Sequence, residues 1–440
     1  MDHYDAIVVG AGPGGATCAA YLAMDNLKVL LIDKEEFPRD KICGDALGGK
    51  SLSHVHAIGA HDSVINSQHY KYTGITMSSA NGNSMTIPLV GNEFAHNTAG
   101  YVVPRKILDN ALFESAQDHV LSNNGTVKVG CKVKSIMWGA DEEADDPGPG
   151  SGDSRIAKGL TYIDQDRNEI SVQGSVIIGA GGYNCPIAKE LVKDTYSLEY
   201  QERPHWCAAF REYYSNVKGC KEENGEIEIH FIDEIIPGYF WIFPAGDGFV
   251  NVGIGMRLDY MDKSTVKLKE MQDWVINHHP IFKERFADST RVEGSNKGWL
   301  LPLGSPRKDG RYEPRRAAGN RVLLVGDAAS LIDPFSGEGI GNAMVSAKFA
   351  ADTVSTIIQG GNPIQAGVEY MEKIWDDLGP ELINSYKLQR MLKRKRLMNW
   401  VIGKAGRKPK IQAMLTDMLA SKKAQEKVHS KWFLIKAFLF

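Results

Sequence analysis

The sequence predicts a mixed α/β fold in which a Rossmann-like βαβ unit is interleaved with an antiparallel β-sheet part and followed by helices. Three observations support this prediction. A β-branched strand with a glycine-rich turn opens the chain, a second buried strand ends in a Gly-Asp turn near residue 326, and the pattern becomes helical from about residue 366. The chain has 440 residues, which is long enough for two or three domains. Its composition, 43% hydrophobic and 24% charged, excludes wholesale disorder.

The first motif occupies residues 5–33. Residues 6–9 form a β-branched run suited to a buried parallel strand, and residues 10–15 read Gly-Ala-Gly-Pro-Gly-Gly. A small-residue helix face follows, and a second strand over 28–32 ends at Asp33. The glycines let backbone N–H groups approach a pyrophosphate, and Asp33 can accept hydrogen bonds from ribose hydroxyls. The alternative is a structural βαβ turn without a ligand. A carboxylate here would repel a 2′-phosphate, which disfavours NADP and leaves FAD or NAD.

The second motif separates FAD from NAD. Residues 321–325 form another buried strand that ends at Gly326-Asp327, and residues 333–341 lead into a helix over 342–358. An Asp at a strand end can bond the ribityl hydroxyls of a flavin, and the glycine-rich helix start directs N–H groups at the ring. We therefore predict FAD as the cofactor. No second βαβ unit follows residues 179–182, so we assign this turn to the single FAD-binding domain and expect no separate Rossmann domain for NAD(P)H. The external electron donor, NAD(P)H or ferredoxin, therefore stays open.

With these motifs, the sequence resembles the FAD-dependent oxidoreductases of the p-hydroxybenzoate hydroxylase fold. Residues 101–109 are similar to the helix start that in this group places an arginine, here Arg105, near the flavin. Residues 176–182 are similar to the strand and turn that return beneath the adenine. Two positions depart from the pattern: Gly181 stands where relatives usually carry Asp, and Cys185 where they usually carry Ser.

Two further segments narrow the resemblance. Residues 34–49 contain Pro38-Arg39, Lys41 and Cys43-Gly44, a block similar to the signature of geranylgeranyl reductases, which hydrogenate isoprenoid C=C bonds. The resemblance implies that the Cys43-Gly44 turn lies beside the isoalloxazine ring. Residues 237–244 and 249–255 resemble the family's Tyr-x-Trp-x-Phe-Pro substrate strand and the Val-Gly-x-Gly that follows it.

Alternative interpretations exist for the aromatic strand and for the cysteine. Tyr239, Trp241 and Phe243 alternate, so they share one face of the strand. Residue statistics favour a sheet core there, whereas the resemblance implies an apolar wall for a polyprenyl chain, with Pro244 at its end. Cys43 is either a small buried apolar group or a thiol beside the flavin that helps to deliver a proton.

The predicted site has one catalytic residue, four substrate residues and a set of FAD contacts. The catalytic residue is Cys43, and the substrate residues are Tyr239, Trp241, Phe243 and Pro244. The predicted FAD contacts are Gly10, Gly12, Gly14, Gly15, Asp33, Lys34, Cys43, Gly44, Arg105, Val133, Gly326, Asp327, Gly337, Gly339 and Ile340. No metal site is predicted, because the six cysteines lack CxxC spacing. We expect the cofactor to carry most of the chemistry.

The motifs divide the chain into three regions. The predicted FAD-binding domain is discontinuous, the substrate domain fills its gaps, and the C-terminal region is helical and basic. The boundaries are 1–70, 101–189 and 315–365 for the FAD-binding domain, 71–100 and 190–314 for the substrate domain, and 366–440 for the C-terminal region. An acidic, Gly/Pro-rich insertion over 141–152 is interpreted as a hairpin loop, since it cannot pack a core.

The formal net charge of −3 is unevenly distributed. From Arg390 to the C-terminus there are 14 Lys and Arg against 2 Asp and Glu, which leaves 37 basic and 52 acidic residues in the rest. The overall balance argues against a nucleic-acid partner. Basic residues among apolar and aromatic ones over 390–440 suit peripheral contact with an anionic membrane; the alternative is a solvated helix face with a docked C-terminus. With no secretory signal and no apolar window of about 18 residues, a cytoplasmic location is expected.

We therefore predict an FAD-dependent reductase that hydrogenates isoprenoid, geranylgeranyl-type C=C bonds of a lipid or prenylated substrate. One alternative is an FAD-dependent aromatic hydroxylase of the same fold. Another is a flavin-binding redox protein without turnover. A flavin halogenase is disfavoured, because the Trp-x-Trp-x-Ile-Pro type of signature is not found.

Overall fold

The computed structural model describes residues 2–89, 99–140, 155–221, 225–265, 267–307 and 315–408. Two segments with sequence predictions lie outside the described residues. They are the acidic insertion at 141–152 and the part of the basic C-terminal region from residue 409 onwards.

The first sheet is built on five parallel strands in the order β19-β11-β1-β2-β8. Its central strand β1 is almost fully buried, which explains its β-branched, apolar sequence. Three more strands join by antiparallel pairing: β18 on β19, β10 on β11, and β9 on β10. The bounds are β1 His3–Val9, β2 Val29–Ile32, β8 Thr126–Lys128, β9 Lys132–Ala140, β10 Arg155–Ile163, β11 Glu169–Gly179, β18 Ala318–Gly319 and β19 Val322–Leu324.

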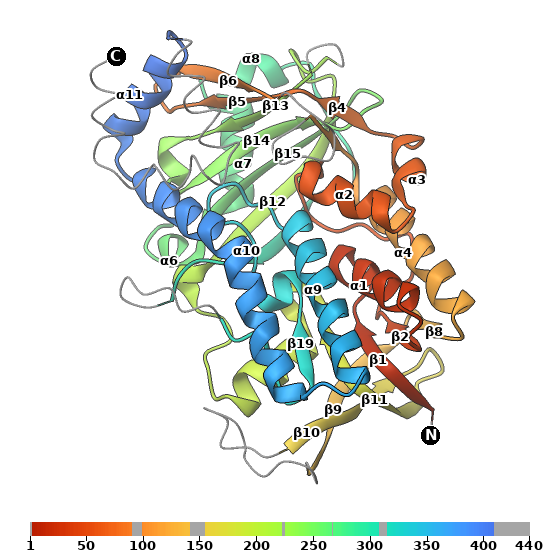
Figure 1. Cartoon of the computed structure of the whole chain (residues 1–440). Coiled ribbons are helices and arrows are strands. Elements are labelled where there is room, and N and C mark those ends of the chain that lie inside the picture. The colour runs from red at the N-terminus through yellow and green to blue at the C-terminus, as the bar shows by residue number, and fades with distance from the viewer. Residues whose placement is uncertain are drawn as a thin grey trace.

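Helices α1, α4 and α9 pack against this sheet, with α1 between the other two (Figure 1). Buried glycine and alanine residues on α1 allow this close approach. The long helix α10 packs on α9, and α11 follows it. The helix bounds are α1 Pro13–Met24, α2 Gly49–Ala57, α3 His61–Ile65, α4 Arg105–Ser122, α5 Pro186–Lys189, α6 Leu258–Met261, α7 Leu268–His278, α8 Lys283–Phe286, α9 Ile340–Ile358, α10 Pro363–Met391 and α11 Lys395–Ala405.

The second sheet has the order β16-β12-β15-β14-β13-β5-β6, with β17 also paired to β12. Its pairings are antiparallel except that of β13 with β5. A small sheet, β3-β7-β4, accompanies it. The bounds are β3 Ala46–Leu47, β4 Tyr70–Tyr72, β5 Gly74–Ser78, β6 Ser84–Pro88, β7 Gly100–Val102, β12 Trp206–Ser215, β13 Glu226–His230, β14 Gly238–Pro244, β15 Phe249–Arg257, β16 Thr290–Arg291 and β17 Lys297–Pro302.

Apolar clusters cover both faces of the second sheet. On one face, Phe240 and Ile242 of β14 pack with residues of α7 and α8. On the other, Trp241 and Phe243 belong to a cluster that includes residues of β4 and β7 as well as Ile402 of α11. Figure 1 shows α11 beside β6, at the end of the molecule opposite β1. The alternation of β14 therefore places its aromatic side chains in two different cores.

The C-terminal helices depart from the bounds that the sequence predicts. The pattern indicates helices over 368–378 and 380–397, with a break at Pro380. This expectation is wrong: α10 continues through Pro380, and the break comes between α10 and α11. Proline removes one N–H donor, but Leu378 and Leu382 on either side are buried in the main core, and this packing outweighs the lost hydrogen bond.

The predicted α/β class, with a Rossmann-like part, an antiparallel sheet and C-terminal helices, is confirmed. The division into FAD-binding and substrate domains stays a prediction. The strands from 74–88 and from 206–302, which it assigns to the substrate domain, do share one sheet. No helix in the described part of the chain has the length and apolar character that crossing a bilayer requires.

Candidate functional site

The glycine turn after β1 leaves no room for side chains at two positions. Gly10 has a φ of +107°, and a Cβ there would lie 2.6 Å from the carbonyl oxygen of Ala180. A Cβ on Gly15 would lie 1.7 Å from the carbonyl oxygen of Gly10, so only glycine lets α1 pack this closely. A Cβ on Gly12 would meet only the guanidinium of Arg39, at 3.2 Å. The backbone at Gly12 is therefore open to a ligand.

The N-terminus of α1 carries N–H groups without side-chain caps. Its N-cap is Gly12, and no acidic residue lies in its first turn. Asp33 is buried, and its two oxygens accept the N–H groups of Ala11 at 2.6 Å and Glu35 at 2.8 Å. Each carboxylate oxygen keeps a further acceptor position, which a ribose hydroxyl can use. The residues present therefore fit a pyrophosphate and a ribose, as in FAD.

The second motif is joined to the segment that precedes Cys43. Lys41 Nζ and Asp327 Oδ2 form an ion pair of 3.2 Å. Gly326 has a φ of +58° and donates its N–H to Ser346 Oγ at 3.0 Å, which fixes the turn before Asp327. The strand end predicted to hold the ribityl chain and the predicted Cys-Gly turn therefore belong to one site.

The loop before α9 lies against the aromatic strand β14. Asp333 Oδ1 accepts the N–H groups of Phe335 at 2.9 Å and Ser336 at 2.7 Å, and Gly337 follows with a φ of +78°. Tyr239 Oη donates to the carbonyl oxygen of Ser336 at 2.5 Å. As in α1, the N-cap of α9 is a glycine and the first turn has no acidic residue, but Glu338 Oε1 already accepts the N–H of Gly341 at 2.5 Å. This end of the site fits the flavin part of the cofactor.

The Cys43-Gly44 turn packs against the same strand. A Cβ on Gly44 would lie 2.8 Å from Cε2 of Phe243, so a glycine is required for this contact. Asn251 of β15 connects the two elements. Its Oδ1 accepts the indole N–H of Trp241 at 2.8 Å, and its Nδ2 donates to the carbonyl oxygen of Cys43, also at 2.8 Å. The fold therefore places the predicted catalytic turn beside the predicted substrate wall.

Asp45 is the buried carboxyl group of this turn. Its Oδ2 accepts hydrogen bonds from Asn251 Nδ2 at 2.6 Å and from the hydroxyl of Tyr213. Its Oδ1 is buried, and no other described residue supplies a hydrogen bond to it. Burial raises the pKa of Asp45 to about 6, although Arg211 and the two hydrogen bonds favour its charged form. Burial also raises the pKa of the Cys43 thiol, which is therefore protonated at neutral pH.

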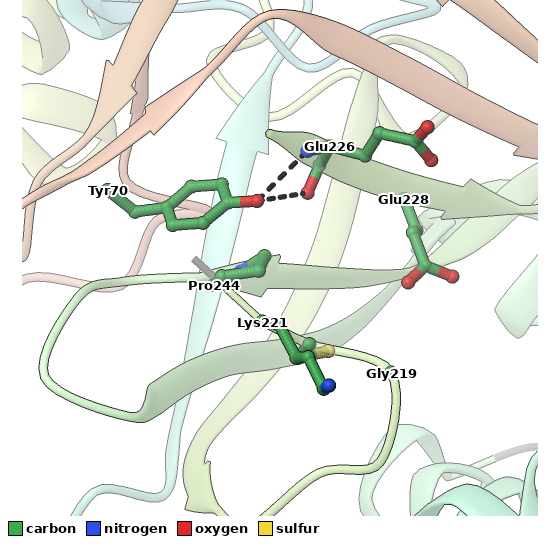
Figure 2. A pocket seen from close by; sticks show the side chains of 7 residues that line it. Tyr70, Gly219, Lys221, Glu226, Glu228 and Pro244 are labelled. Atoms are coloured by element: carbon green, nitrogen blue, oxygen red, sulfur yellow. Dashed lines mark hydrogen bonds between the residues drawn. The ribbon is translucent and has the colours of Figure 1, made fainter. Parts of the chain in front are cut away.

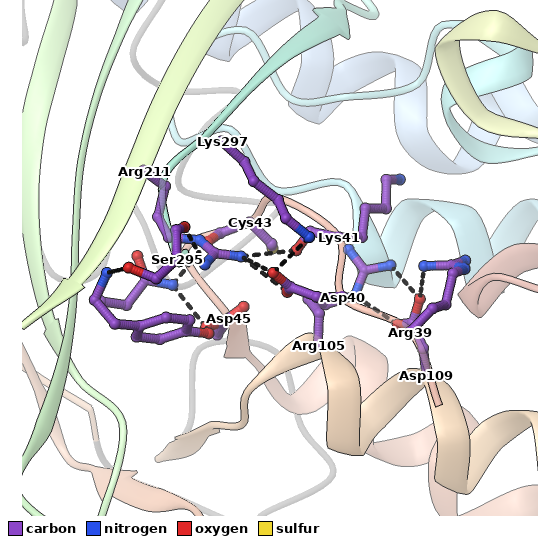
Figure 3. Close-up of polar contacts among 12 residues, drawn as sticks. Arg39, Asp40, Lys41, Cys43, Asp45, Arg105, Asp109, Arg211, Ser295 and Lys297 are labelled. Atoms are coloured by element: carbon purple, nitrogen blue, oxygen red, sulfur yellow. Dashed lines mark hydrogen bonds and ion pairs between the residues drawn. The ribbon is translucent and has the colours of Figure 1, made fainter. Parts of the chain in front are cut away.

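Two ionic clusters flank the turn (Figure 3). In the first, Asp40 pairs with the fully buried Arg211 at 2.9 Å and with Lys297 at 3.0 Å. In the second, Arg105 forms two hydrogen bonds to Asp109, of 2.5 and 2.8 Å, and Arg39 adds a contact of 2.8 Å. Burial would raise the pKa of Asp109, but Arg105 and Arg39 hold it below its usual range. Through Arg39 and Asp40, these clusters connect the segment before the turn to α4, β12 and β17.

Two of the three alternating aromatic residues of β14 are core residues, and the third is partly exposed. Trp241 and Phe243 are buried in the apolar cluster, whereas Tyr239 is half-buried. Gly253 makes room for the indole, because a Cβ there would lie 2.0 Å from Cζ2 of Trp241. Contact of these residues with a substrate stays a prediction.

Pro244 directly follows Phe243 but lies on the opposite face of β14 from Tyr239, Trp241 and Phe243. It shares its strand face with Phe240 and Ile242, and it lines a pocket of about 210 Å³ at the far end of β14 (Figure 2). Tyr70, Gly219, Cys220, Lys221, Glu226 and Glu228 complete the lining. Burial would raise the pKa of Glu228, but hydrogen bonds from His230 and Arg285 lower it to about 2. Such a charged lining does not suit an apolar polyprenyl chain, and contact of Pro244 with a substrate stays a prediction.

Some predicted FAD contacts serve other visible roles. Lys34 is largely exposed and pairs with Glu35 at 3.3 Å. Val133 is buried on β9, and Ile340 is buried at the start of α9. A Cβ on Gly14 would lie 3.3 Å from Ala343, so this glycine sits where α1 meets α9. Their contacts with FAD stay predictions.

Sequence reasoning missed the polar residues around the turn. Two signals were available in the sequence: Asp45 closely follows Cys43-Gly44, and Asn251 stands within the segment 249–255. The structure pairs Asn251 with Phe243 of β14. The other residues that only the fold brings to the site are Asp109, Arg211 and Tyr213. The two departures from the family pattern also lie together, since a Cβ on Gly181 would be 3.3 Å from Cys185 Sγ.

Two parts of the chain match described protein families. Residues 206–290 match the geranylgeranyl reductase catalytic domain, and residues 8–67 match an NAD(P)-binding Rossmann-like domain. The first match contains the aromatic strand and Asn251. The second contains the glycine turn and the Cys43-Gly44 turn.

Two curated relatives that match most of this chain are reductases. The digeranylgeranylglycerophospholipid reductase of Thermoplasma acidophilum is 29% identical over 426 residues, which cover 95% of this chain and 89% of the relative. The menaquinone reductase of Mycobacterium tuberculosis is 26% identical over 357 residues, which cover 81% of this chain and 77% of the relative.

Solved structures show the same fold. A geranylgeranyl bacteriochlorophyll reductase-like protein from Thermoplasma acidophilum has a TM-score of 0.73 at 21% identity, covering 97% of this chain and 99% of that one. A flavin-dependent brominase has a TM-score of 0.72 at 19% identity, covering 95% and 93%. The fold neighbours alone do not separate reductases from brominases, but the catalytic-domain match and the reductase relatives do. The chain is therefore similar to the geranylgeranyl reductases among the FAD-dependent oxidoreductases, in its matched catalytic domain and along most of its length.

Proposed function

We propose that the protein is an FAD-dependent reductase that hydrogenates isoprenoid, geranylgeranyl-type C=C bonds of a lipid or prenylated substrate. The observation that carries this proposal is two of the hydrogen bonds made by Asn251. They join Trp241, within the matched catalytic domain, to Cys43 in the turn that by family resemblance adjoins the isoalloxazine ring. A prenyl chain along the aromatic face would therefore have a double bond beside the flavin.

Residues of both motifs would hold the cofactor. The N–H groups at the start of α1 would bind the pyrophosphate, Asp33 the adenosine ribose, and Asp327 the ribityl chain. FAD, once reduced, supplies a hydride to the double bond. The protein's own side chains orient the apolar chain, exclude water and hold the proton that completes the hydrogenation. The electron donor is NAD(P)H or ferredoxin, and adding each to the anaerobic protein while following flavin absorbance would identify it.

An anaerobic experiment tests the function. The bound flavin is photoreduced, a geranylgeranyl lipid is added in detergent micelles, and flavin absorbance is followed. Reoxidation of the flavin with a mass gain of two hydrogens per reduced bond supports the reductase. The names of the curated relatives indicate the first two substrates to test, a digeranylgeranylglycerophospholipid and menaquinone. Absence of any substrate-linked reoxidation would instead favour a flavin-binding redox protein without turnover.

The second candidate is an FAD-dependent aromatic hydroxylase. Its support is the shared fold of flavin enzymes with other reactions, such as the brominase. In the same experiment a hydroxylase would leave the flavin reduced until O₂ is admitted. Oxygen would then enter an aromatic substrate, and the prenyl lipid would keep its mass.

We also propose that the basic segment 390–440 contacts an anionic membrane, through residues that include the described part around α11. The exposed basic residues around α11 are Lys393, Arg394, Lys395, Arg396, Arg407 and Lys408. The buried side of α11, through Ile402, belongs to the same apolar cluster as Trp241 and Phe243. A membrane-bound lipid would therefore meet a basic surface directly beside the aromatic wall. The alternative of a solvated helix face has support in the ion pair between Lys395 and Asp233, at 3.2 Å.

Co-sedimentation with liposomes tests the membrane contact. Arg394→Glu together with Arg396→Glu should weaken binding to phosphatidylglycerol vesicles by at least about tenfold, because each basic residue near such a surface contributes about 1 kcal/mol. The matched control is Lys269→Glu with Lys283→Glu, two exposed residues on the opposite face of the second sheet. Equal loss in both variants, or binding that salt does not weaken, would contradict a specific contact. The cytoplasmic location stays a prediction.

A further inference from the structure

We propose that Asp45 is the acid that supplies the proton for reduction of the double bond, and that Tyr213 and Asn251 position its carboxyl group. The proposal rests on the reductase function given above and names a residue for a step that the sequence assigned to Cys43. Figure 3 shows Asp45 on the segment that carries Cys43, between the β12 strand and the α4 helix.

The backbone places Asp45 at the turn. Asp45 has a φ of +66°, and its carbonyl oxygen accepts the N–H of Val103, the residue after β7, at 2.9 Å. Asn251 donates both to the carbonyl oxygen of Cys43 and to Asp45 Oδ2, while its own oxygen is held by Trp241. The carboxyl group therefore lies one residue beyond the Cys43-Gly44 turn and is bonded to the residue that also holds the aromatic wall.

The two carboxyl oxygens of Asp45 have different surroundings. Oδ2 accepts two hydrogen bonds, from Asn251 and Tyr213. Oδ1 is buried and receives none from any part of the chain that the structure describes. An ionised oxygen buried without a donor is costly, whereas a protonated one is a hydroxyl that can donate. The arrangement therefore favours a proton on Oδ1, the oxygen that makes no hydrogen bond with a described residue.

The charges around Asp45 prepare it to lose that proton. Arg211 and Tyr213 face it from β12, Arg105 from α4, and Cys43 from its own segment. Burial raises the pKa of Asp45 to about 6, and the guanidinium groups stabilise the carboxylate that remains after transfer. Burial raises the pKa values of the Cys43 thiol and the Tyr213 phenol as well, so both are weaker acids than Asp45.

The step balances with a hydride from reduced FAD. The π bond of the isoprenoid breaks, one carbon takes up the hydride with its electron pair, and the other takes the proton from Asp45. Two C–H bonds form, the alkene is reduced by two electrons, and Asp45 is left as a carboxylate. The proton returns from solvent before the next turnover.

Anaerobic reoxidation of the photoreduced holoprotein by a geranylgeranyl-bearing ether phospholipid in micelles tests the proposal. For the unmodified protein, the rate constant should fall as pH rises through about 6, since the acid must be protonated. Asp45→Asn should slow it at least about 100-fold with full FAD occupancy, and Asp45→Glu should restore part of it. Cys43→Ser should slow the reaction much less than Asp45→Asn and should leave the pH midpoint near 6. Tyr213→Phe should move the midpoint to higher pH, because the phenol favours the carboxylate.

A second readout does not depend on turnover. In the oxidised holoprotein, the carbonyl band of a protonated carboxyl group should disappear from infrared difference spectra as pH rises through about 6. Asp45→Asn should remove the Asp45 component of this transition, whereas the bands of Asp333 and Glu338, whose pKa values burial also raises, should persist. Asp164→Asn, in the turn between β10 and β11, is the matched control and should leave the Asp45 component unchanged.

The outcomes separate this proposal from the function on which it rests. If the unmodified protein is not reoxidised by the lipid, the reductase function fails and the role of Asp45 fails with it. If the unmodified protein is reoxidised and Asp45→Asn reacts equally fast with the same pH profile, only the role of Asp45 is overturned. Loss of reaction in Cys43→Ser with full activity in Asp45→Asn would return the role to the thiol.

Discussion

Trp241 of β14 donates its indole N–H to the side-chain oxygen of Asn251 on β15 over 2.8 Å, and both side chains are buried. Because the indole nitrogen can only donate, this bond orients the amide and turns Nδ2 towards Cys43 and Asp45. The same indole belongs to the apolar cluster of the second sheet. Core packing and the geometry of the polar cluster therefore depend on one side chain.

Trp241→Phe separates these two roles, because it keeps an aromatic ring and removes the N–H group. The free energy of unfolding should fall by about 1–3 kcal/mol, since Asn251 Oδ1 is left buried without its donor. The KM for the prenyl substrate should rise far more than FAD occupancy falls. Urea unfolding and steady-state kinetics measure the two effects. Trp274→Phe, on the surface of α7, should change stability by less than about 0.5 kcal/mol. An unchanged KM would leave Trp241 as a core residue alone.

Gly253→Ala should displace the indole of Trp241. A Cβ at this position would lie 2.0 Å from Cζ2 of Trp241, and overpacking of this kind costs about 1–3 kcal/mol. Gly255→Ala, two residues further along β15, is the matched control, because its nearest neighbour would be 3.6 Å away. Thermal unfolding followed by tryptophan fluorescence should show a lower Tm and a shifted emission spectrum for Gly253→Ala only. Similar Tm values for the two variants would contradict the tight contact.

Two alanine substitutions in the glycine turn should have different effects, one on folding and the other on FAD affinity. Gly15→Ala places a Cβ 1.7 Å from the carbonyl oxygen of Gly10, so the protein should unfold or lose its helix packing. Gly12→Ala meets only the flexible side chain of Arg39 and should fold normally. Its methyl group would instead lie where the pyrophosphate approaches, and FAD affinity should fall at least about tenfold, or about 1.4 kcal/mol. Flavin titration with circular dichroism measures both, and a Gly12→Ala variant with unweakened FAD binding would contradict the assignment.

The stability of Asp45→Asn should differ from that of the unmodified protein in a pH-dependent way. The pKa of Asp45 is about 6 in the folded protein, against about 3.9 when unfolded. Between these values the folded state binds the extra proton, so the contribution of Asp45 to the free energy of unfolding falls as pH rises from about 4 to 6, by at most about 3 kcal/mol. Asparagine does not titrate, so the variant should gain relative stability across this window. Urea unfolding of the FAD-saturated proteins at several pH values checks this, and a constant difference would contradict a raised pKa.

Much of the FAD-binding part could be predicted from local sequence. Gly10, Gly12 and Gly15 stand at the spacing that a strand–turn–helix unit requires, and the structure places each where a close backbone contact or an open approach needs a glycine. The end of the second strand at Asp33 also follows from local pattern. Prediction failed at Pro380, because the local rule that proline breaks helices was outweighed by burial on either side, which no local window shows.

The sequence by itself determined the βαβ unit, the glycine turns, the alternation of the aromatic strand and the uneven charge of the chain. These properties follow from residues a few positions apart, where the spacing of helices and strands dictates which groups can meet. Only the tertiary structure decided which polar groups share the Cys43 turn. Tyr213 lies 168 residues from Asp45, and Asn251 lies 206 residues from it. Contacts over such separations arise from the pairing of whole strands and the burial of their faces, which no local pattern in one sequence specifies.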